Sequence, residues 1–152
     1  MTIHLENRQK TVKIDLRRIR RVVRKLMHAL DCPDREISLL FVDDEQIRLI
    51  NRQYLDRDRP TNVISFSLGE GDYGSINPQV LGDVVISVER AARDAAAGGL
   101  ALDDEIDFLL IHGLLHLLGY NHEGVEQSET TRMMQKENEV FSLLHGYELE
   151  RC

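Results

Sequence analysis

The chain has 152 residues, 42% of them hydrophobic and 30% charged, a size and composition that fit one domain with its own core and exclude a disordered chain. Its longest apolar stretch, residues 108–118, contains two histidines and is too short to span a bilayer. The N-terminus lacks the basic and apolar regions of a signal peptide, and two cysteines offer no disulfide framework. We therefore expect a soluble, cytoplasmic protein with no membrane partner.

The net charge of −7 is unevenly distributed along the chain. Residues 8–25 hold nine arginines and lysines against one acid, Asp15, so this segment carries +8 and the remainder carries −15. A basic face on an acidic body can bind phosphates. A solvated helix face that offsets the acids elsewhere is the simpler explanation, and charge alone does not decide between the two.

Helices and strands alternate along the predicted structure. In chain order we predict a helix over residues 15–30, a strand over 36–42, a helix over 43–54, strands over 62–67 and 82–88, an alanine-rich helix from there to Gly98, and helices over 102–118 and 127–145. Asp15 and Asp43 are suitable N-caps for the first two helices. Gly99 and Gly119 can end the third and fourth helices.

This pattern predicts an α+β (mixed α/β) fold in a single domain over residues 1–152. We expect a small mixed sheet of about four strands packed with about five helices. Residues 68–81, with three glycines and a proline, predict a long exposed loop. The helix over residues 102–118 is apolar on nearly all sides past Asp107, so it should be buried.

Three histidines at the end of this buried helix are the most informative feature of the sequence. His112 and His116 are four residues apart, so on a helix both side chains lie on one face. Gly119 can adopt the left-handed conformation that turns the chain back and brings His122 round. A single buried histidine is usually structural, but three at this spacing are hard to explain without a metal ion. We predict that His112, His116 and His122 bind a metal.

Three nitrogen ligands with a fourth position open are typical of a catalytic zinc site, in which the ion acidifies a water molecule. Zinc, one ion per chain, is therefore the expected cofactor, although three imidazoles also suit nickel, copper or iron. The spacing is that of the metzincin proteases. Their general-base glutamate follows the first histidine, where this chain has Gly113, so proteolysis is disfavoured.

Residues 112–122, HGLLHLLGYNH, resemble the signature H-G-x-L-H-L-x-G-Y-D-H of the YbeY family. Residues 51–66 are similar to the family's N-x-x-Y-R-x-x-D-x-P-T-D/N-V-L-S-F segment, and residues 81–87 to its L-G-D-I-x-I-S strand. The three segments match in order and spacing, and together they span most of residues 36–145. The metal-site helix on which the histidines lie is thus expected to be part of a YbeY-like metallohydrolase domain.

The chain departs from the family pattern at two positions. Asn121 replaces an aspartate beside the third histidine, which removes a negative charge but leaves the three ligands in place. Leu55 replaces the arginine that the family has after its tyrosine, and Arg59, or else Arg57, is expected to supply a guanidinium nearby. We predict Arg59 as the catalytic cation that stabilises charge developing on a phosphate, with a surface charge in a turn as the alternative.

The resemblance implies a metal-dependent endoribonuclease that cleaves single-stranded RNA, matures the 3′ end of 16S ribosomal RNA and takes part in ribosome quality control. It also implies the small ribosomal subunit and its assembly proteins as partners. The helix over residues 17–25 can form one wall of an RNA-binding cleft. Asp83 and Glu123 are candidates for a general base, each with a structural or solvated role as the alternative.

Three other functions remain open at the level of sequence. A ribosome-associated assembly factor with a metal-organised binding site and little catalysis predicts RNA or ribosome binding that survives removal of the metal. Another zinc metallohydrolase, acting on a small phosphoester or peptide, predicts turnover that is indifferent to the charge of the basic helix. A purely structural zinc is least expected, because no fourth protein ligand is evident.

Overall fold

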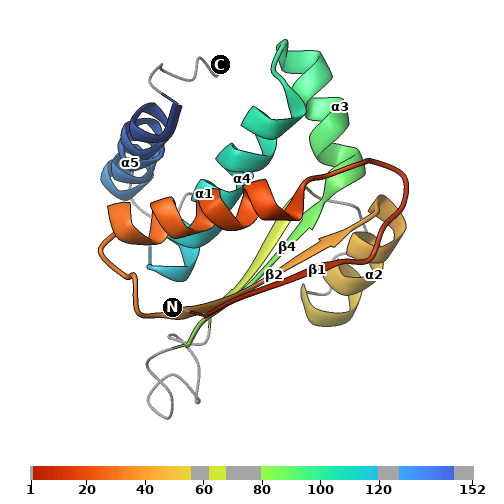
Figure 1. The fold of residues 1–152 in the computed structure, drawn as a ribbon, viewed down its shortest axis with the longest axis horizontal. Coiled ribbons are helices and arrows are strands. Elements are labelled where there is room, and N and C mark those ends of the chain that lie inside the picture. The colour runs from red at the N-terminus through yellow and green to blue at the C-terminus, as the bar shows by residue number, and fades with distance from the viewer. Residues whose placement is uncertain (1, 56–61, 68–79, 120–126, 146–152) are drawn as a thin grey trace.

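The protein is built around one mixed β-sheet of four strands in the spatial order β1-β2-β4-β3 (Figure 1). This computed structural model describes residues 2–55, 62–67, 80–119 and 127–145. The strands are β1 (Thr2–Asn7), β2 (Glu36–Val42), β3 (Val63–Ser67) and β4 (Val80–Ser87). β1, β2 and β4 run parallel to one another, and β3 pairs antiparallel with β4 at one edge. The predicted α+β class with a small mixed sheet is confirmed.

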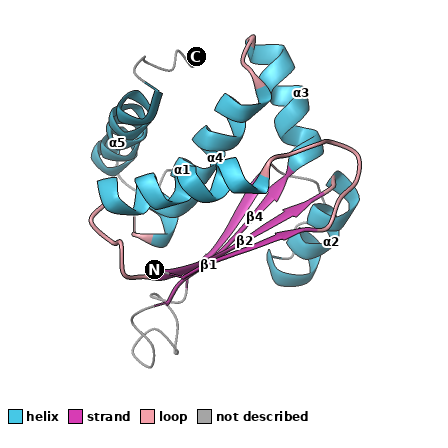
Figure 2. Cartoon of the chain, viewed as in Figure 1, coloured by secondary structure: helices cyan, strands magenta, loops and turns pink. Residues whose placement is uncertain are grey.

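Five described helices cover the two faces of this sheet unequally (Figure 2). They are α1 (Leu16–Ala29), α2 (Asp44–Leu55), α3 (Val88–Gly98), α4 (Leu102–Leu117) and α5 (Gln127–His145). α2 lies on one face, α1, α3 and α4 pack on the other, and α5 packs against α4 and α1. Among the described helices, we find none with the length and hydropathy of a bilayer span.

Side chains that alternate along the strands separate the two faces of the sheet. Val84 on β4 faces α4, because a Cβ added to Gly113 of α4 would lie 2.7 Å from Val84 Cγ1. The neighbouring Asp83 and Val85 point to the opposite face, where Val85 packs with Ile47 of α2. The main core therefore lies between the sheet and α1, α3 and α4, and a smaller core lies beneath α2.

α4 is the central helix of the protein, with 10 of its 16 residues buried, as its apolar sequence predicts. α5 packs against it in the antiparallel direction. Asp104 of α4 contacts His145 of α5, and His112 of α4 contacts Glu137 of α5. These two contacts are eight residues apart on both helices, so the same faces of α4 and α5 meet along about two turns.

Hydrogen bonds confirm the predicted helix ends. The Asp15 carboxylate accepts backbone N–H bonds of 3.0 and 3.2 Å from the first turn of α1, and Asp43 accepts one of 2.8 Å from the first turn of α2. Gly99, at the end of α3, has a φ of 71°, and Gly119, just past α4, has a φ of 99°. Local sequence signals therefore place these four ends correctly.

β1 is the one described strand that the sequence prediction did not locate. Ile3 and Leu5 alternate with His4 and Glu6 in the period of two that is typical of a strand, but six residues give a weak signal. All of β1 pairs in parallel with β2, which lies some 30 residues further along the chain. This long-range pairing completes the sheet of about four strands that the overall pattern predicts.

Candidate metal centre

Two of the three predicted metal ligands converge on one face of α4. The Nε2 atoms of His112 and His116 lie 3.1 Å apart, and their rings are inclined at 78° to each other. Both side chains are partly buried. The ring of Phe108, one turn earlier on α4, stacks on His112 with the centroids 6.2 Å apart. The four-residue spacing on a helix thus brings the two imidazoles together as predicted.

The geometry of this pair fits a shared zinc ion. Two nitrogen ligands at 2.0–2.1 Å from a tetrahedral zinc are about 3.3 Å apart, close to the 3.1 Å between the two Nε2 atoms. Both histidines also lie towards the C-terminal end of α4, where the helix macrodipole favours a cation. His122, the third predicted ligand, lies outside the described residues, and its part in the site stays a prediction.

The residue after the first histidine faces the core. A Cβ on Gly113 would lie 2.7 Å from Val84 Cγ1 and 3.3 Å from Ser65 Oγ. The Ser65 hydroxyl donates a 3.3 Å hydrogen bond to the carbonyl oxygen of Gly113, which holds β3 against α4. A glutamate side chain has no room at this position. The fold therefore closes the place from which metzincin proteases supply their general base, in agreement with the sequence argument against proteolysis.

A buried carboxylate that the sequence prediction missed lies beside His112. Glu137 of α5 has 3% of its side chain exposed, and its Oε2 atom lies 3.4 Å from His112 Nδ1. Met133, Val140 and Phe141 are buried on the same helix, so Glu137 is an acid within an apolar stripe. An acid at a core position of an amphipathic helix is the sequence signal that marks this residue.

Several predicted site residues lie outside the described part of the chain: Arg57, Arg59, Asn121 and Glu123. Asp83, one candidate general base, is described and points away from the histidines. Its neighbour Val84 faces Gly113 of α4, and successive strand residues point to opposite faces. The suggestion that Asp83 acts as a base beside the histidines is therefore wrong.

Asp83 instead lines a groove of about 920 Å³ on the face of the sheet that carries α2. His4, Ser38 and Asp83 lie side by side across three neighbouring strands of this groove. Tyr54 of α2 also lines this groove and is 63% exposed. Its ring packs edge-on against the ring of Phe66, with the two ring centroids 5.6 Å apart. The described parts of the three family segments thus meet where Ser65 and Val84 contact Gly113, while Asp83 and Tyr54 of the same segments line the groove on the other face of the sheet.

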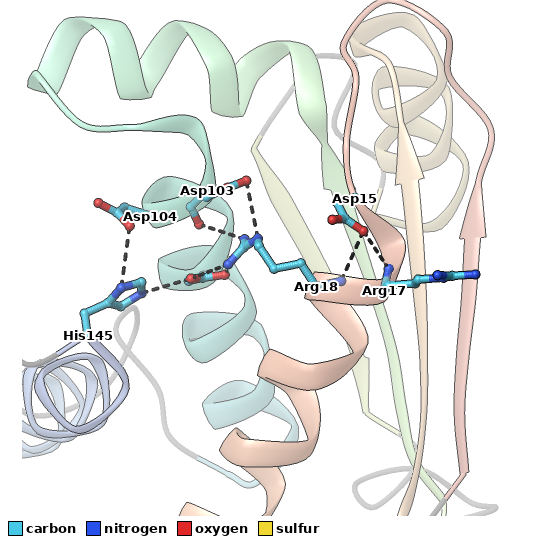
Figure 3. A network of polar contacts seen from close by, with 7 residues as sticks. Asp15, Arg17, Arg18, Asp103, Asp104 and His145 are labelled. Carbon is cyan, nitrogen blue, oxygen red and sulfur yellow. Dashed lines mark hydrogen bonds and ion pairs between the residues drawn. The ribbon is translucent and has the colours of Figure 1, made fainter.

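A second cluster of metal-type ligands joins α4 and α5, and Arg18 of α1 contacts it (Figure 3). Asp104, Asp107 and His145 each offer a donor atom within 4.8 Å of the others, a spacing compatible with one metal ion. Arg18 of α1 donates hydrogen bonds of 3.1 and 2.9 Å to the two carboxylate oxygens of Asp107. Both ring nitrogens of His145 also face acids, Nε2 at 2.9 Å from Asp107 and Nδ1 at 3.5 Å from Asp104.

The charges in this second cluster favour an ion-pair network. Burial lowers the pKa of Arg18, but the hydrogen bonds and charge of Asp107 outweigh it and the net pKa is raised, so the guanidinium stays charged. A divalent cation bound to Asp107 would be repelled by that charge. The His112–His116 pair is consequently the better candidate for a metal centre.

Comparisons with known proteins identify the family of this chain. The sequence model of a family described as "Endoribonuclease YbeY" matches residues 4–145. The chain belongs to the YbeY family. Proteins named "Endoribonuclease YbeY" from Syntrophus aciditrophicus and Geobacter sulfurreducens are 61% and 50% identical to it, over 99% and 96% of this chain and 94% and 97% of theirs.

A solved structure of similar fold supports the architecture. The solution structure of a protein from Thermotoga maritima superposes with a TM-score of 0.66 at 23% identity, over 95% of this chain and 90% of that chain. The YbeY match also contains all three segments from which the resemblance was drawn, residues 51–66, 81–87 and 112–122. The predicted family is therefore confirmed.

Proposed function

We propose that this chain is a metal-dependent endoribonuclease that cleaves single-stranded RNA and acts in ribosomal RNA processing. The observation that carries the proposal is the 3.1 Å approach of the Nε2 atoms of His112 and His116, which suits two ligands of one ion. The relatives of this chain are named endoribonucleases. Hydrolysis of a phosphodiester is a reaction that a metal on such ligands can support.

Zinc is the proposed ion, held by His112, His116 and His122, with nickel or another transition metal as the alternative. When bound with an open position, zinc supplies an acidified water molecule and polarises a phosphoryl oxygen. The buried helix α4 fixes the directions of the two described imidazoles, because most of its side chains are locked by packing. Gly113 fills the side that faces the sheet, so RNA must reach the histidines from another side of α4.

A cationic side chain is also needed, because negative charge develops on the phosphate during hydrolysis. We propose Arg59 for this role, with Arg57 as the alternative, since Leu55 stands where the family pattern has an arginine. α2 ends at Leu55 and β3 begins at Val63, so both arginines belong to the short connection between these elements.

The exposed side of α1 offers a surface for RNA phosphates. Four basic side chains are exposed there and form no ion pair with the described residues, namely Arg17, Arg21, Arg24 and Lys25. Arg18 and Arg20 have structural partners instead, Asp107 and the carbonyl oxygen of Ile3 at 2.8 Å. We call the four exposed residues the basic stripe and propose that it contributes to RNA binding.

For the natural substrate we propose the 3′ end of 16S ribosomal RNA, together with a role in ribosome quality control in the cytoplasm. The chain has four tyrosines, four phenylalanines and no tryptophan, so base stacking offers little sequence preference. Partners that position the RNA are therefore part of the proposal, and they are the small ribosomal subunit and its assembly proteins.

The test combines metal analysis with RNA cleavage at moderate salt. Wild-type protein is expected to carry about one zinc per chain and to cut single-stranded RNA, and His116→Ala is expected to lose both. Glu139→Gln, which changes an exposed acid on α5, is the control and should keep both. If neither wild type nor variant cuts RNA while RNA binding persists without metal, the nuclease proposal is overturned in favour of an assembly factor.

A further inference from the structure

The buried carboxylate of Glu137 is hard to explain by packing alone. Its neighbours on α5, Met133, Val140 and Phe141, are at most 1% exposed, and only 3% of its own side chain is exposed. A buried carboxylate needs compensation from a partner, whereas an apolar side chain of similar size would complete the stripe without that requirement. The position therefore calls for a role that an apolar residue does not fill.

Glu137 contacts His112 on the side of the ring that faces away from His116. Its Oε2 atom lies 3.4 Å from His112 Nδ1, whereas His112 Nε2 lies 3.1 Å from His116 Nε2. Because a carboxylate only accepts hydrogen bonds, this contact places the hydrogen of the neutral ring on Nδ1. The lone pair is then on Nε2, the atom that points to His116.

We infer that Glu137 is a positioning residue, which orients His112 and selects the tautomer whose Nε2 can bind metal. The inference rests on the metal centre proposed above for His112 and His116. Glu137 is not a ligand of the same ion, because its carboxylate lies at Nδ1 and not beside the two Nε2 atoms. A carboxylate behind a ligating histidine typically changes metal affinity by about 10–100-fold.

A second contact between the same helices serves as an internal comparison. Here the acids are on α4 and the imidazole is on α5: His145 lies 3.5 Å from Asp104 and 2.9 Å from Asp107, the reverse of the contact between Glu137 of α5 and His112 of α4. If Glu137 only holds α4 and α5 together, then neutralising Glu137 should have the same effect on zinc affinity as neutralising Asp104. A residue that positions a ligand would affect metal binding beyond any effect on stability.

The experiment compares Glu137→Gln, Asp104→Asn and Glu139→Gln with the wild type. Zinc affinity is measured by competition with a chelator, and the tautomer of His112 by nitrogen-15 NMR of the metal-free protein. Glu137→Gln is expected to bind zinc about 10–100-fold more weakly at unchanged stoichiometry, with loss of the pure Nδ1–H tautomer. The other two variants should keep wild-type affinity and tautomer, and thermal unfolding of the metal-free proteins reports any loss of stability.

The outcomes separate this inference from the proposed function. Wild-type affinity and tautomer in Glu137→Gln, alongside zinc loss in His116→Ala, would overturn the positioning role and leave the metal centre intact. Equal weakening in Glu137→Gln and Asp104→Asn would make Glu137 a purely structural residue. Loss of zinc in Asp104→Asn alone would move the metal to the second cluster, and a wild type that binds no zinc would overturn the centre and the inference together.

Discussion

Successive residues of α4 turn by about 100° around the helix, so neighbours in the histidine segment meet different surroundings. His112 faces Glu137 of α5, Gly113 faces Val84 of β4, and Ile111 is fully buried. Substitutions at adjacent positions therefore have separable effects on metal binding and on packing.

Gly113→Ala is expected to destabilise the fold while leaving both histidines in place. The added Cβ would lie 2.7 Å from Cγ1 of the stiff, buried Val84, and such overpacking costs about 1–3 kcal/mol. The helix propensity of alanine returns about 1 kcal/mol, so the free energy of unfolding in urea should fall by up to about 2 kcal/mol. Gly98→Ala is the control, because a Cβ on Gly98 would have nothing within 4 Å. An equal loss of unfolding free energy in both variants would contradict the close packing of Gly113 against Val84.

Arg59→Ala is expected to lower kcat for RNA cleavage by about 10²–10³-fold, because it removes the cation that we propose for stabilising charge in the transition state. KM should change little, since the basic stripe still binds the substrate. Arg57→Ala is the matched control in the same steady-state assay. A reversed result would transfer the role to Arg57, and two unaffected variants would remove this cation from the mechanism.

At the scale of elements, α4 is the helix to which α1 and α5 are both joined by charged contacts. Arg18 of α1 binds the fully buried Asp107 of α4, and His145 of α5 approaches the same carboxylate. Glu137 of α5 reaches His112, five residues further along α4 than Asp107. The packing of α5 on α4 thus also sets the surroundings of the proposed metal ligand.

Asp107→Asn is expected to lower the free energy of unfolding by about 2–3 kcal/mol, or roughly 5–8 °C in Tm. The loss of stability would be larger if both partners of the ion pair were fully buried. The Arg18 side chain is 21% exposed, however, and its ion pair with Asp103 at 3.4 Å remains in the variant. Asp94→Asn removes the exposed pair with Arg90 and should cost less than about 0.5 kcal/mol. If calorimetric scans show the same decrease in Tm for Asp107→Asn and Asp94→Asn, the buried ion pair of Asp107 does not stabilise the fold more than an exposed one.

At the scale of the whole molecule, the basic segment of the sequence becomes an exposed basic surface on α1. The chain outside residues 8–25 carries a net charge of −15. The four residues of the basic stripe on α1, in contrast, are positively charged and exposed. Elsewhere among the described residues, Arg48 pairs with Glu45, Arg90 with Asp94, and Arg93 with Asp44, whereas Arg35 and Arg52, each on a different segment, form no ion pair with described residues. The stripe is thus the surface at which the proposed RNA substrate would gain most from phosphate contacts.

Replacing Arg17, Arg21 and Arg24 together by alanine is expected to weaken RNA binding and flatten its salt dependence. Removing one side chain that binds a phosphate reduces the slope of log K against log salt by about 0.7 for a single strand. The control replaces the paired Arg48, Arg90 and Arg93, which changes the net charge equally but leaves the slope near its wild-type value. Equal slopes in the two triple variants, measured by fluorescence anisotropy, would show that only net charge matters.

Features set by near neighbours in the sequence were predictable. The two imidazoles on one face of α4 follow from a spacing of four residues, and the caps at Asp15 and Asp43 need only the first turn of each helix. The family could also be predicted, because its three segments keep their order and spacing in this chain.

Contacts between distant segments were decided by the tertiary structure. β1 becomes a strand because β2 pairs with it, Asp83 faces the groove because Val84 packs towards α4, and Glu137 meets His112 because α5 returns antiparallel along α4. The physical reason is range. Helical hydrogen bonds and caps act within about four residues, so the sequence by itself determined them, whereas packing joins side chains whose separation in the chain says nothing about their distance in space.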